Sequence, residues 1–396
     1  MAINPAYVTD IESQFKPTHD ERARQSFIST VRKHAIIDMR REMDQDWSQR
    51  VAPALQARGA EVHGWKDIYS AMEKVPSFQF YSSIRYNAQE MCYLSVQPAI
   101  ERALPGMISL AREANKKLIA GGSLRLNPAM EMPRYLQALD VHLAPGWTHS
   151  EFTADDVAQG AVISFGGKVF TGQHPFRKHP GVIAQTTAEW LKRKFPEFKP
   201  RRVLDLGTTS GKNLLPYLEI FPGIEAHGVD VGAPVLRFGH AVAENAGLPV
   251  HYSQQNAEQM DFPDGHFDLI VSSFFFHEVP VKATRNILRE CRRLLRPGGH
   301  MVHLELPNDT AVGDYANFFW NWDTANNNEP FYTSFRQQDP IALCSEAGFK
   351  RESCFAQLVP DFASSGEEKF ERFVKGEVAA PNHGAGGWFF FGALSV

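Results

Sequence analysis

The sequence predicts an α/β fold in which a mainly helical N-terminal part precedes a parallel sheet. From residue 201 onward, short apolar runs alternate with helical stretches, which is the pattern of βαβ units. Before residue 160, apolar residues instead recur three and four positions apart, as in amphipathic helices. A chain of 396 residues, 43% hydrophobic and 22% charged, is long enough to bury a core in each part.

In the C-terminal part, the expected strands and helices alternate regularly. Short apolar runs bounded by polar or glycine-containing turns predict strands, and the longer periodic stretches between them predict helices. The expected strands cover 202–207, 225–231, 250–256, 267–273, 300–306 and the apolar stretch 386–396. The expected helices cover 181–195, 211–221, 234–246, 281–295 and about 337–347.

The N-terminal part is expected to consist of long helices with one break. Helical periodicity runs through about 19–58 and again through 96–122, where Pro105 should divide the second stretch into two helices. The segment 163–172 has a Gly-Gly pair at its centre, which predicts a short hairpin or a bent loop. We take 1–160 as a separate domain that serves as a lid or in dimerisation.

Composition and charge argue against several classes of partner. The formal net charge is −4, so no basic surface for nucleic acid or an anionic membrane is expected. The four cysteines form no CxxC pair and fit reduced thiols. No secretory signal pattern and no membrane-spanning apolar run is present in the sequence. The expectation is a cytoplasmic enzyme for a small molecule, with a homodimer as one arrangement.

The stretch VLDLGTTSGKN (203–213) has the pattern of a buried strand followed by a tight turn into a helix. Gly207 and Gly211 allow the backbone to approach a ligand closely because no Cβ intervenes. Asp205 lies just before the turn, where a carboxylate can accept hydrogen bonds from a cationic amine or from backbone amides. Taken alone, the motif also fits an ordinary strand-to-helix turn.

Polar side chains also follow the next two strands. Asp230 ends the second strand, where its carboxylate can accept hydrogen bonds from both hydroxyls of a ribose. Capping of the following helix is the alternative for this aspartate. Asn256 ends the third strand and can hydrogen-bond an adenine amine, while Ala257 packs against the ring. Because the carboxyl ends of parallel strands share one edge, these groups should converge on one ligand.

A dinucleotide-dependent oxidoreductase is the main competitor for such a loop. Its fingerprint is G-x-G-x-x-G, without an acid two residues before the first glycine. Here the order is D-x-G-x-x-x-G over 205–211, and the carboxylate of Asp205 would repel a diphosphate. The loop therefore favours a cofactor with a cationic end.

Four motifs between 201 and 306 resemble the core of the class I S-adenosylmethionine-dependent methyltransferases, in the branch similar to the quinone-biosynthesis methyltransferases. VLDLGTTSG resembles the cofactor loop of that family, and the acid at 229–230 resembles its second-strand acid. NAEQMDFPDGHFDLIVSS (256–273) resembles the segment that leads into the fourth strand. LRECRRLLRPGGHMV (288–302) resembles the following helix, turn and fifth strand.

The resemblance implies a Rossmann-like sheet of seven strands, parallel except for one, in a domain covering 161–396 with an aromatic-rich insertion at about 307–345. Thr209 replaces a glycine of the family loop and Asn256 replaces an acid, but both are small and polar. S-adenosylmethionine is the implied cofactor and S-adenosylhomocysteine the product. The implied cofactor contacts are Asp205, Gly207, Thr208, Thr209 and Gly211 at the methionine end, Asp230 at the ribose, Val231, Asn256 and Ala257 at the adenine, and Ser272 near the methyl group.

Methyl transfer from a sulfonium is an in-line displacement. The protein therefore mainly aligns the nucleophile and excludes water, and a base is needed where the nucleophile is a hydroxyl. His277 follows the fourth strand and is the candidate base, because an imidazole titrates near neutral pH. Packing or capping at the next helix is the alternative. Glu305, near the end of the fifth strand, is a candidate contact of the substrate.

The aromatic residues after the fifth strand have two interpretations. Their helical spacing favours packing in the core. The alternative is an aromatic wall around a planar or cationic acceptor, formed by Tyr315, Phe319 and Trp320. Several histidines match no known ligand spacing, so no metal site is predicted at His142, His149, His174 or His179.

These features predict an enzyme that transfers a methyl group from S-adenosylmethionine to oxygen, nitrogen or carbon of a small molecule, with aromatic compounds as one acceptor class. The alternative is a protein of the same fold that binds S-adenosylmethionine or S-adenosylhomocysteine for a non-methylating reaction or for regulation. The motifs describe the cofactor and leave the acceptor open.

Overall fold

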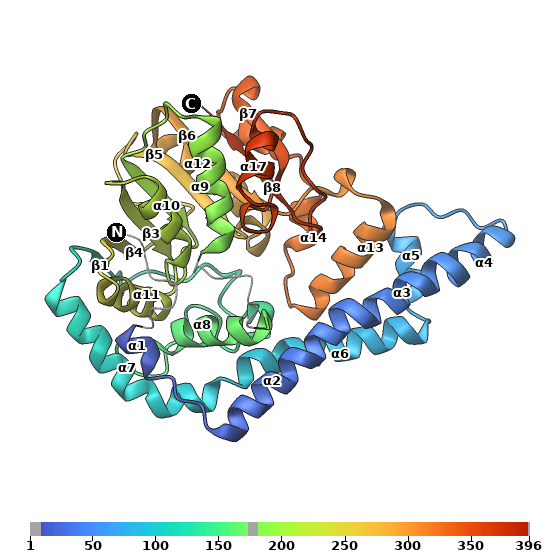
Figure 1. Ribbon diagram of the computed structural model, residues 1–396, viewed down its shortest axis with the longest axis horizontal. Coiled ribbons are helices and arrows are strands. Elements are labelled where there is room, and N and C mark those ends of the chain that lie inside the picture. The colour runs from blue at the N-terminus through green and yellow to red at the C-terminus, as the bar shows by residue number, and fades with distance from the viewer. Residues whose placement is uncertain (1–8, 173–180, 395–396) are drawn as a thin grey trace.

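An eight-stranded sheet forms the centre of the protein in the computed structural model, which describes residues 9–172 and 181–394 (Figure 1). The strand order is β1-β4-β3-β2-β5-β6-β8-β7. The strands are β1 Ser123–Arg125, β2 Arg202–Leu206, β3 Glu225–Asp230, β4 Val250–Gln254, β5 Phe267–Ser273, β6 Leu295–Glu305, β7 Cys354–Pro360 and β8 Gly387–Ala393.

Strand β8 runs antiparallel to both of its neighbours, and every other pair of neighbours is parallel. The prediction of a single antiparallel strand is therefore confirmed, but the predicted count of seven strands is wrong. The additional strand is β1, which comes from the N-terminal part and pairs with β4, with Ser123 opposite His251. Its sequence, Ser-Leu-Arg, has no apolar run that would have indicated a strand.

Helices cover both faces of the sheet because successive strand residues point to opposite sides. Leu204 of β2 belongs to an apolar cluster with residues of α12 and α15, whereas the adjacent Val203 belongs to one with α9, α10 and α11. The helices of this part start and end close to their predicted positions. They are α9 Val182–Lys194, α10 Leu215–Ile220, α11 Ala233–Asn245, α12 Val281–Leu294 and α15 Pro340–Glu346, whereas α17 Glu367–Val374 was not predicted.

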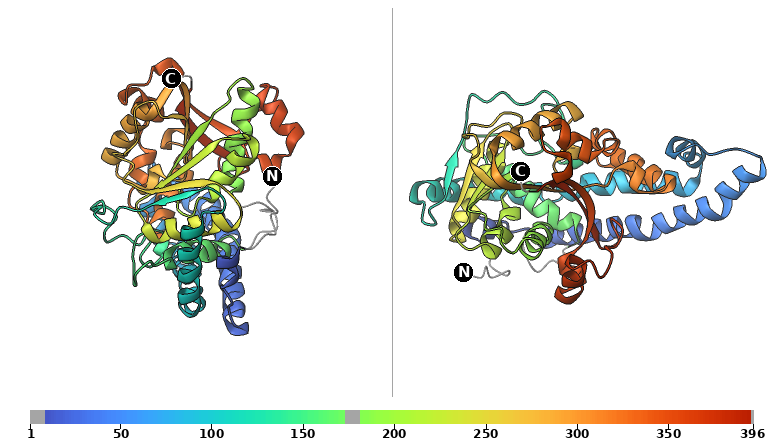
Figure 2. Two further views of the ribbon diagram at one scale, coloured as in Figure 1. Left: turned by 90° about the vertical axis from the view of Figure 1, so that its left-hand side faces the viewer. Right: turned by 90° about the horizontal axis from the view of Figure 1, so that it is seen from above.

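The N-terminal helices form an arm that projects beyond the sheet (Figure 1, and Figure 2, right). A continuous helical stretch confirms the helix expected over 19–58, and α6 runs beside it. The stretch consists of α2 His19–His34, η1 Ala35–Met39, α3 Arg40–Asp46, η2 Trp47–Val51 and α4 Ala52–Ala57. The other helices of this part are α5 Trp65–Met72, α6 Pro76–Leu94, α7 Gln97–Lys117 and α8 Ala158–Phe170.

The predicted break at Pro105 is wrong, because α7 continues through it. Proline in a helix interior removes one backbone hydrogen bond and crowds the preceding turn, at a cost of about 3 kcal/mol. Ile100 and Met107 lie on either side of the proline and are both buried in the same apolar cluster. Burial on both sides of Pro105 offsets the local cost and keeps the helix continuous.

The predicted hairpin at 163–172 is also wrong, because these residues belong mainly to helix α8. The Gly-Gly pair that suggested a turn has a different purpose here. A Cβ at Gly166 would lie 2.6 Å from the ring of Tyr93 on α6. The glycine therefore allows α8 to pack closely against α6, a tertiary requirement that local sequence patterns do not reveal.

The aromatic-rich stretch after β6 forms α13 Asp314–Asp323, which packs against the helical arm. The rings of Phe318 and Trp322 lie 6.0 and 4.1 Å from the ring of Phe78 on α6. Burying one aromatic side chain contributes about 1.5–3 kcal/mol, so this cluster fixes the arm to the insertion. The arrangement agrees with the core-packing interpretation of these aromatic residues.

Short helical turns connect the main elements. No described helix combines the length and the apolar character needed to cross a lipid bilayer. The connecting turns are α1 Asp10–Ser13, η3 Val141–Leu143, η4 Lys212–Leu214, η5 Phe276–Glu278, η6 Asp309–Ala311, η7 Thr324–Asn326, α14 Tyr332–Arg336, η8 Arg351–Ser353 and α16 Phe362–Ser365.

Candidate active site

A cavity lies at the carboxyl ends of β2, β3, β4 and β5, the edge at which open parallel sheets bind their ligands. Its empty volume, counted out to open solvent, is about 880 Å³. The residues that were predicted to bind a cofactor and that line this cavity form its cofactor wall. They are Gly207, Thr209, Asp230, Val231, Asn256 and Ala257.

Two glycines of the loop at the floor of the cavity lie so close to neighbouring side chains that neither position has room for a Cβ. Gly207 and Gly211 have left-handed backbones, with φ of 64° and 76°. A Cβ at Gly207 would lie 2.4 Å from the ring of Phe275, and one at Gly211 would lie 2.1 Å from the hydroxyl of Tyr252. Both glycines are therefore required by conformation and by space.

Thr209 occupies the loop position at which the family pattern has a glycine. Its φ is 49°, so it adopts the left-handed conformation that a glycine would adopt without strain. Its backbone N–H donates to Oδ2 of Asp230 at 3.0 Å. The departure from the pattern therefore preserves the course of the loop and introduces local backbone strain of about 1–2 kcal/mol.

Backbone N–H groups hold both carboxylate oxygens of Asp230. Its Oδ1 accepts the N–H of Gly232 at 2.9 Å, while Oδ2 accepts the N–H of Thr209. Burial raises the pKa of this carboxyl to about 6, although the backbone donors oppose the shift. A carboxylate held in this way lines the cavity and still has lone pairs for vicinal hydroxyls.

Asp205 and Thr208 lie behind the loop and do not line the cavity. The hydroxyl of Thr208 donates to Oδ2 of Asp205 at 2.8 Å, and Gly211 N–H donates to the Thr208 carbonyl at 2.8 Å. Burial raises the pKa of Asp205 to about 7. These contacts stabilise the loop from the side of the sheet, and Asp205, Thr208 and Gly211 are not among the residues that line the cavity.

Ser272 points away from the cavity, and its neighbour takes the expected position. The Ser272 hydroxyl lies 2.8 Å from Nδ1 of His303, and both side chains are buried. Ser273 lines the cavity instead. Adjacent residues of a strand face opposite sides, so the prediction from the sequence missed the residue that lines the cavity by one position.

The cavity fits an adenosyl cofactor with a cationic end better than a dinucleotide. Among the described residues that line it, none is a lysine or an arginine that would hold a diphosphate. Asp230 offers a carboxylate for ribose hydroxyls. Gly207 has no Cβ, which would otherwise collide with the ring of Phe275, so its backbone stays accessible to a ligand. These residues therefore fit S-adenosylmethionine.

The predicted base His277 is enclosed by two carboxylates. Its Nδ1 lies 2.8 Å from Oε2 of Glu305, and its Nε2 lies 3.4 Å from Oε1 of Glu278. Burial disfavours the charged imidazole, but Glu305 and Glu278 hold the pKa of His277 well above its ordinary value. Because both ring nitrogens face carboxylates, this arrangement disfavours the role of a base that takes a proton from an acceptor.

The predicted substrate contacts lie outside the cavity lining. Glu305 is fully buried, where it accepts from the Phe276 and Leu306 N–H groups as well as pairing with His277. The aromatic side chains pack against the helical arm or against the end of β8. Their partners include Asp44 and Trp47 for Tyr315, Arg40 and Tyr81 for Phe319, and Arg336 and His383 for Trp320.

The opposite side of the cavity is formed by a segment that the sequence analysis missed. This cover segment, residues 135–148, contributes the side chains of Tyr135, Leu136, His142, Trp147 and Thr148. The stretch Asp-Val-His-Leu-Ala-Pro-Gly-Trp-Thr-His has no regular periodicity, and its one signal was the clustering of histidine with tryptophan. His149, also in this stretch, does not line the cavity, and His174 and His179 lie outside the described residues.

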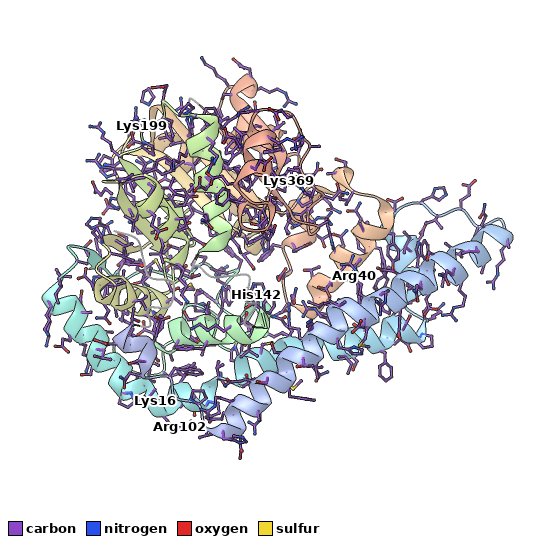
Figure 3. The ribbon with its side chains drawn as sticks, in the orientation of Figure 1. Lys16, Arg40, Arg102, His142, Lys199 and Lys369 are labelled. Carbon is purple, nitrogen blue, oxygen red and sulfur yellow. The ribbon has the colours of Figure 1, made fainter. Side chains whose placement is uncertain are left out.

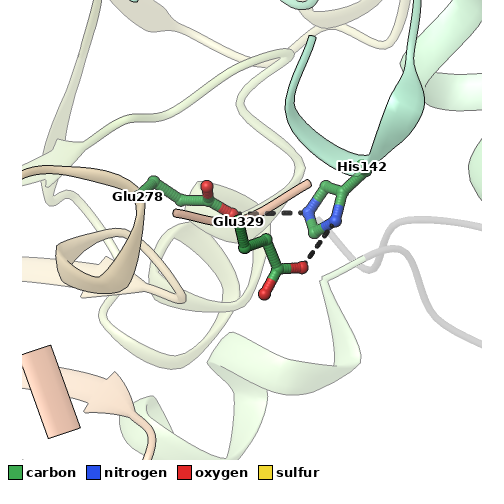
Figure 4. Close-up of side chains that lie close together, drawn as sticks. All are labelled: His142, Glu278 and Glu329. Atoms are coloured by element: carbon green, nitrogen blue, oxygen red, sulfur yellow. Dashed lines mark ion pairs between the residues drawn. The ribbon is translucent and has the colours of Figure 1, made fainter. Parts of the chain in front are cut away.

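His142 joins three distant segments at the cavity edge (Figure 4). Its Nε2 lies 3.4 Å from Oε1 of Glu278, and its Nδ1 lies 2.9 Å from Oε1 of Glu329. In the view of Figure 3, His142 lies between the sheet and the helical arm. Burial disfavours its charged form, but the two carboxylates raise the pKa of His142 above its ordinary value.

Strained backbone is concentrated around the cavity. The described non-glycine residues with positive φ include His142 at 58°, Trp147 at 43°, Thr209 at 49° and Phe274 at 56°. All four line the cavity. Such conformations persist only where the surrounding structure enforces them, and they cluster at functional sites. Strained backbone therefore lies on both sides of this candidate site.

Comparison with known proteins gives a match for the central part of the chain. Residues 203–299 match a family model described as a methyltransferase domain. The chain is 38% identical over 111 residues to a demethylmenaquinone methyltransferase of Thermus thermophilus, covering 28% of this chain and 50% of that protein. It is 37% identical over 109 residues to a ubiquinone/menaquinone biosynthesis C-methyltransferase of Vibrio vulnificus, covering 26% and 41%.

The chain thus spans half, or less, of the length of these curated relatives. Among solved structures, it is similar to a putative O-methyltransferase of Nostoc punctiforme. That likeness has a TM-score of 0.43 and 16% identity, and it covers 77% of this chain and 72% of the other.

Proposed function

We propose that this chain, whose residues 203–299 belong to the class I S-adenosylmethionine-dependent methyltransferases, transfers a methyl group to a small-molecule acceptor. The family match confirms the resemblance inferred from the four sequence motifs. The acceptor atom is oxygen, nitrogen or carbon, and aromatic compounds are one acceptor class. The first part of the chain, 1–160, is proposed to cover the active site through its cover segment.

The observation that carries this proposal is the cavity at the strand ends. Its cofactor wall brings together side chains from three consecutive strand ends, in the order that the motifs predict. In the proposed complex, Asp230 holds the ribose, and Val231, Asn256 and Ala257 contact the adenine. Gly207 and Thr209 hold the methionine end, while Asp205, Thr208, Gly211 and Ser272 support these residues from behind.

When bound, S-adenosylmethionine supplies a methyl group that its sulfonium already activates. The chain has to hold the acceptor in line and exclude water. We assign the acceptor to the part of the cavity between the cover segment and the residues after β5. Phe274, Phe275 and Trp147 supply apolar walls there, while Glu278 and His142 supply the polar groups.

His277 acts in this scheme as a positioning residue. Held by Glu305 at 2.8 Å, it approaches Glu278 and fixes the carboxylate that lines the cavity. Tyr315 and Phe319 act at a further distance, by fixing the insertion against the helical arm, and Trp320 acts by packing against His383. Their contribution to substrate binding is therefore indirect.

The proposal also covers where the protein is located and how two copies pair. We infer a cytoplasmic enzyme without a nucleic-acid partner, because the formal net charge of −4 offers no general attraction to phosphates. Pairing of two copies is proposed to use the projecting arm. Phe27 on α2 and Phe80 on α6 are 63% and 68% exposed there, and they are the candidate contacts.

Formation of S-adenosylhomocysteine tests the proposed function directly. The protein is incubated with S-adenosylmethionine and a panel of quinols, phenols and small amines, and products are identified by mass spectrometry. We expect S-adenosylhomocysteine to form with at least one acceptor class, and not with an Asp230→Ala control. Absence of turnover with every acceptor, together with no calorimetric binding of S-adenosylhomocysteine, would reject the proposal.

A further inference from the structure

Three potential metal ligands from distant parts of the chain meet beside the cavity. His142 lies in η3, Glu278 in η5 after β5, and Glu329 between η7 and α14. One donor atom from each side chain lies within 4.8 Å of the others (Figure 4). The carboxylates of Glu278 and Glu329 both point toward the imidazole, so the three groups converge on a single region.

The backbone holds this convergence in place. His142 and Leu143 both adopt left-handed conformations, with φ of 58° and 57°. The carbonyl of His142 accepts from Nε2 of Gln89 at 3.0 Å, which fixes the residue from the side of α6. A histidine in such a conformation is uncommon and is enforced by its surroundings.

The polar atoms of this cluster lack ordinary hydrogen-bond partners. Oε2 of Glu278 and Nδ1 of His142 are both buried and have no hydrogen-bond partner among the described residues. The side chain of Glu329 is 5% exposed, and its contact with Nδ1 of His142, although only 2.9 Å long, is not aligned as a hydrogen bond. Buried carboxylates are costly unless positive charge compensates them, and the groups that face Glu278 and Glu329 here are the imidazoles of His142 and His277.

We propose that His142, Glu278 and Glu329 bind one divalent first-row cation, of the class of Mn²⁺ or Zn²⁺. One imidazole and two carboxylates form a mixed nitrogen and oxygen donor set, which suits these ions better than soft cations that need thiolates. Three carboxylates, those of Glu278, Glu305 and Glu329, face the imidazoles of two histidines, His142 and His277, so a divalent cation would compensate the remaining negative charge.

Neighbouring residues are arranged as supports for such ligands. Glu278 is approached by Nε2 of His277 at 3.4 Å, and His277 is itself fixed by Glu305 at 2.8 Å. Residues around a metal site usually orient its ligands through contacts of this kind. The carboxylate of Glu278 is therefore positioned by a chain of buried groups that begins on β6.

The location of the cluster gives the cation a function. His142 and Glu278 line the cavity, while Glu329 lies behind them. Three protein ligands leave coordination positions open, as in catalytic rather than structural metal sites. His142 and Glu278 line the part of the cavity assigned to the acceptor, so a cation held by them would be placed to bind an oxygen atom of the acceptor. This last step rests on the proposed methyl transfer, whereas the metal site itself does not.

Calorimetry on tag-free protein, stripped of metal with a chelator and measured without cofactor, tests the site. We expect MnCl₂ or ZnCl₂ to bind with one ion per chain. His142→Gln and Glu329→Gln should each weaken binding at least tenfold. The control is His63→Gln, because His63 lies 3.2 Å from Glu61 in an exposed pair, and this substitution should leave metal binding unchanged.

The outcomes separate the metal site from the proposed function. The metal site is rejected if neither ion binds the wild type, or if His142→Gln and Glu329→Gln bind as tightly as His63→Gln. Should Glu329→Gln fail to fold, His142→Gln decides, because that side chain is 26% exposed at the cavity edge. Metal binding without any binding of S-adenosylhomocysteine would reject the methyltransferase proposal and leave the metal site standing.

Discussion

The two sides of the cavity are built in opposite ways. The cofactor wall comes from consecutive strand ends, and its residues are brought together by the register of β2, β3 and β4, in which Asp205 pairs with Gly228 and Asp230 with Gln254. The cover segment has no such framework. It is held by side chains far away in the sequence, such as Gln89, whose Nε2 donates to the His142 carbonyl, and Asn328, whose Nδ2 donates to the Asp140 carbonyl.

This difference separates the cofactor side, which many enzymes share, from the acceptor side, which is particular to this protein. A cofactor shared by many enzymes is bound by a framework that short motifs encode, because strand, turn and register are local or nearly local features. The acceptor side depends on which distant segments fold over the cavity. Variants that act on one side and spare the other therefore test the division.

The largest effect is expected at Gly211, behind the cofactor wall, where the glycine loop has no room for a side chain. Gly211→Ala places a methyl group at φ 76° and 2.1 Å from the hydroxyl of Tyr252. Left-handed strain and overpacking together should lower the free energy of unfolding by about 3 kcal/mol. Chemical denaturation measures this loss.

The matched control for Gly211→Ala is Gly167→Ala on α8. At Gly167 a new Cβ would meet nothing within 4 Å, and the residue is helical. Alanine has the higher helix propensity, so a gain of up to about 1 kcal/mol is expected there. Equal changes in the free energy of unfolding for the two substitutions would show that the loop relaxes around the new side chain. That result would contradict a rigid loop at Gly211.

The sequence predicted the strands around the cofactor because their apolar runs are short, regular and bounded by turns. It failed where tertiary contacts decide. β7 and β1 were not expected, Gly166 suggested a turn although it serves close helix packing, and Ser272 was chosen where Ser273 lines the cavity. The cluster of His142, Glu278 and Glu329 has no sequence signature, since its members lie in three unrelated segments.

A second test concerns the buried carboxyl behind the cofactor wall. Burial raises the pKa of Asp205 from 3.8 to about 7, so the folded state binds its proton more tightly than the unfolded state does. Its contribution to stability is therefore full below about pH 4 and is lost as the pH rises to about 7. Asp205→Asn removes this loss, and we expect a gain on the order of 2 kcal/mol at pH 8.

Denaturation curves for Asp205→Asn should converge with those of the wild type near pH 4. Asp20→Asn is the control, because the Asp20 side chain is 93% exposed and its removal should change stability by less than about 0.5 kcal/mol at either pH. A gain that is the same at pH 4 and pH 8 would assign the effect to packing instead of ionisation.

A third test compares the two sides of the cavity directly. Asp230→Ala removes an acceptor for ribose hydroxyls and should weaken S-adenosylhomocysteine binding by roughly 10–100-fold, since each charge-assisted hydrogen bond contributes about 1.5–3 kcal/mol. Glu278→Gln should change that affinity less than about twofold while lowering turnover. Calorimetry and rate measurements on both variants decide, and similar losses of cofactor affinity would remove the distinction between the two sides.

The smallest expected effect concerns Thr209, the residue that replaces a glycine in the loop. Thr209→Gly relieves left-handed strain of about 1–2 kcal/mol but also increases the entropy of the unfolded chain by about 0.4–1 kcal/mol. The net gain in stability should therefore be about 0.5 kcal/mol, read from the denaturation midpoint. Thr153→Gly is the control, because Thr153 lies in an exposed loop without positive φ, where only the entropic loss applies.

The sign of the Thr209 result also decides how the cofactor wall uses this side chain. The backbone N–H that donates to Asp230 is retained in Thr209→Gly, so a stabilised variant with unchanged S-adenosylhomocysteine affinity would leave the hydroxyl without a binding role. A stabilised variant that binds the cofactor more weakly would assign the hydroxyl to the cofactor. A destabilised variant would instead contradict the strain inferred from φ, because relief of strain should exceed the entropic loss.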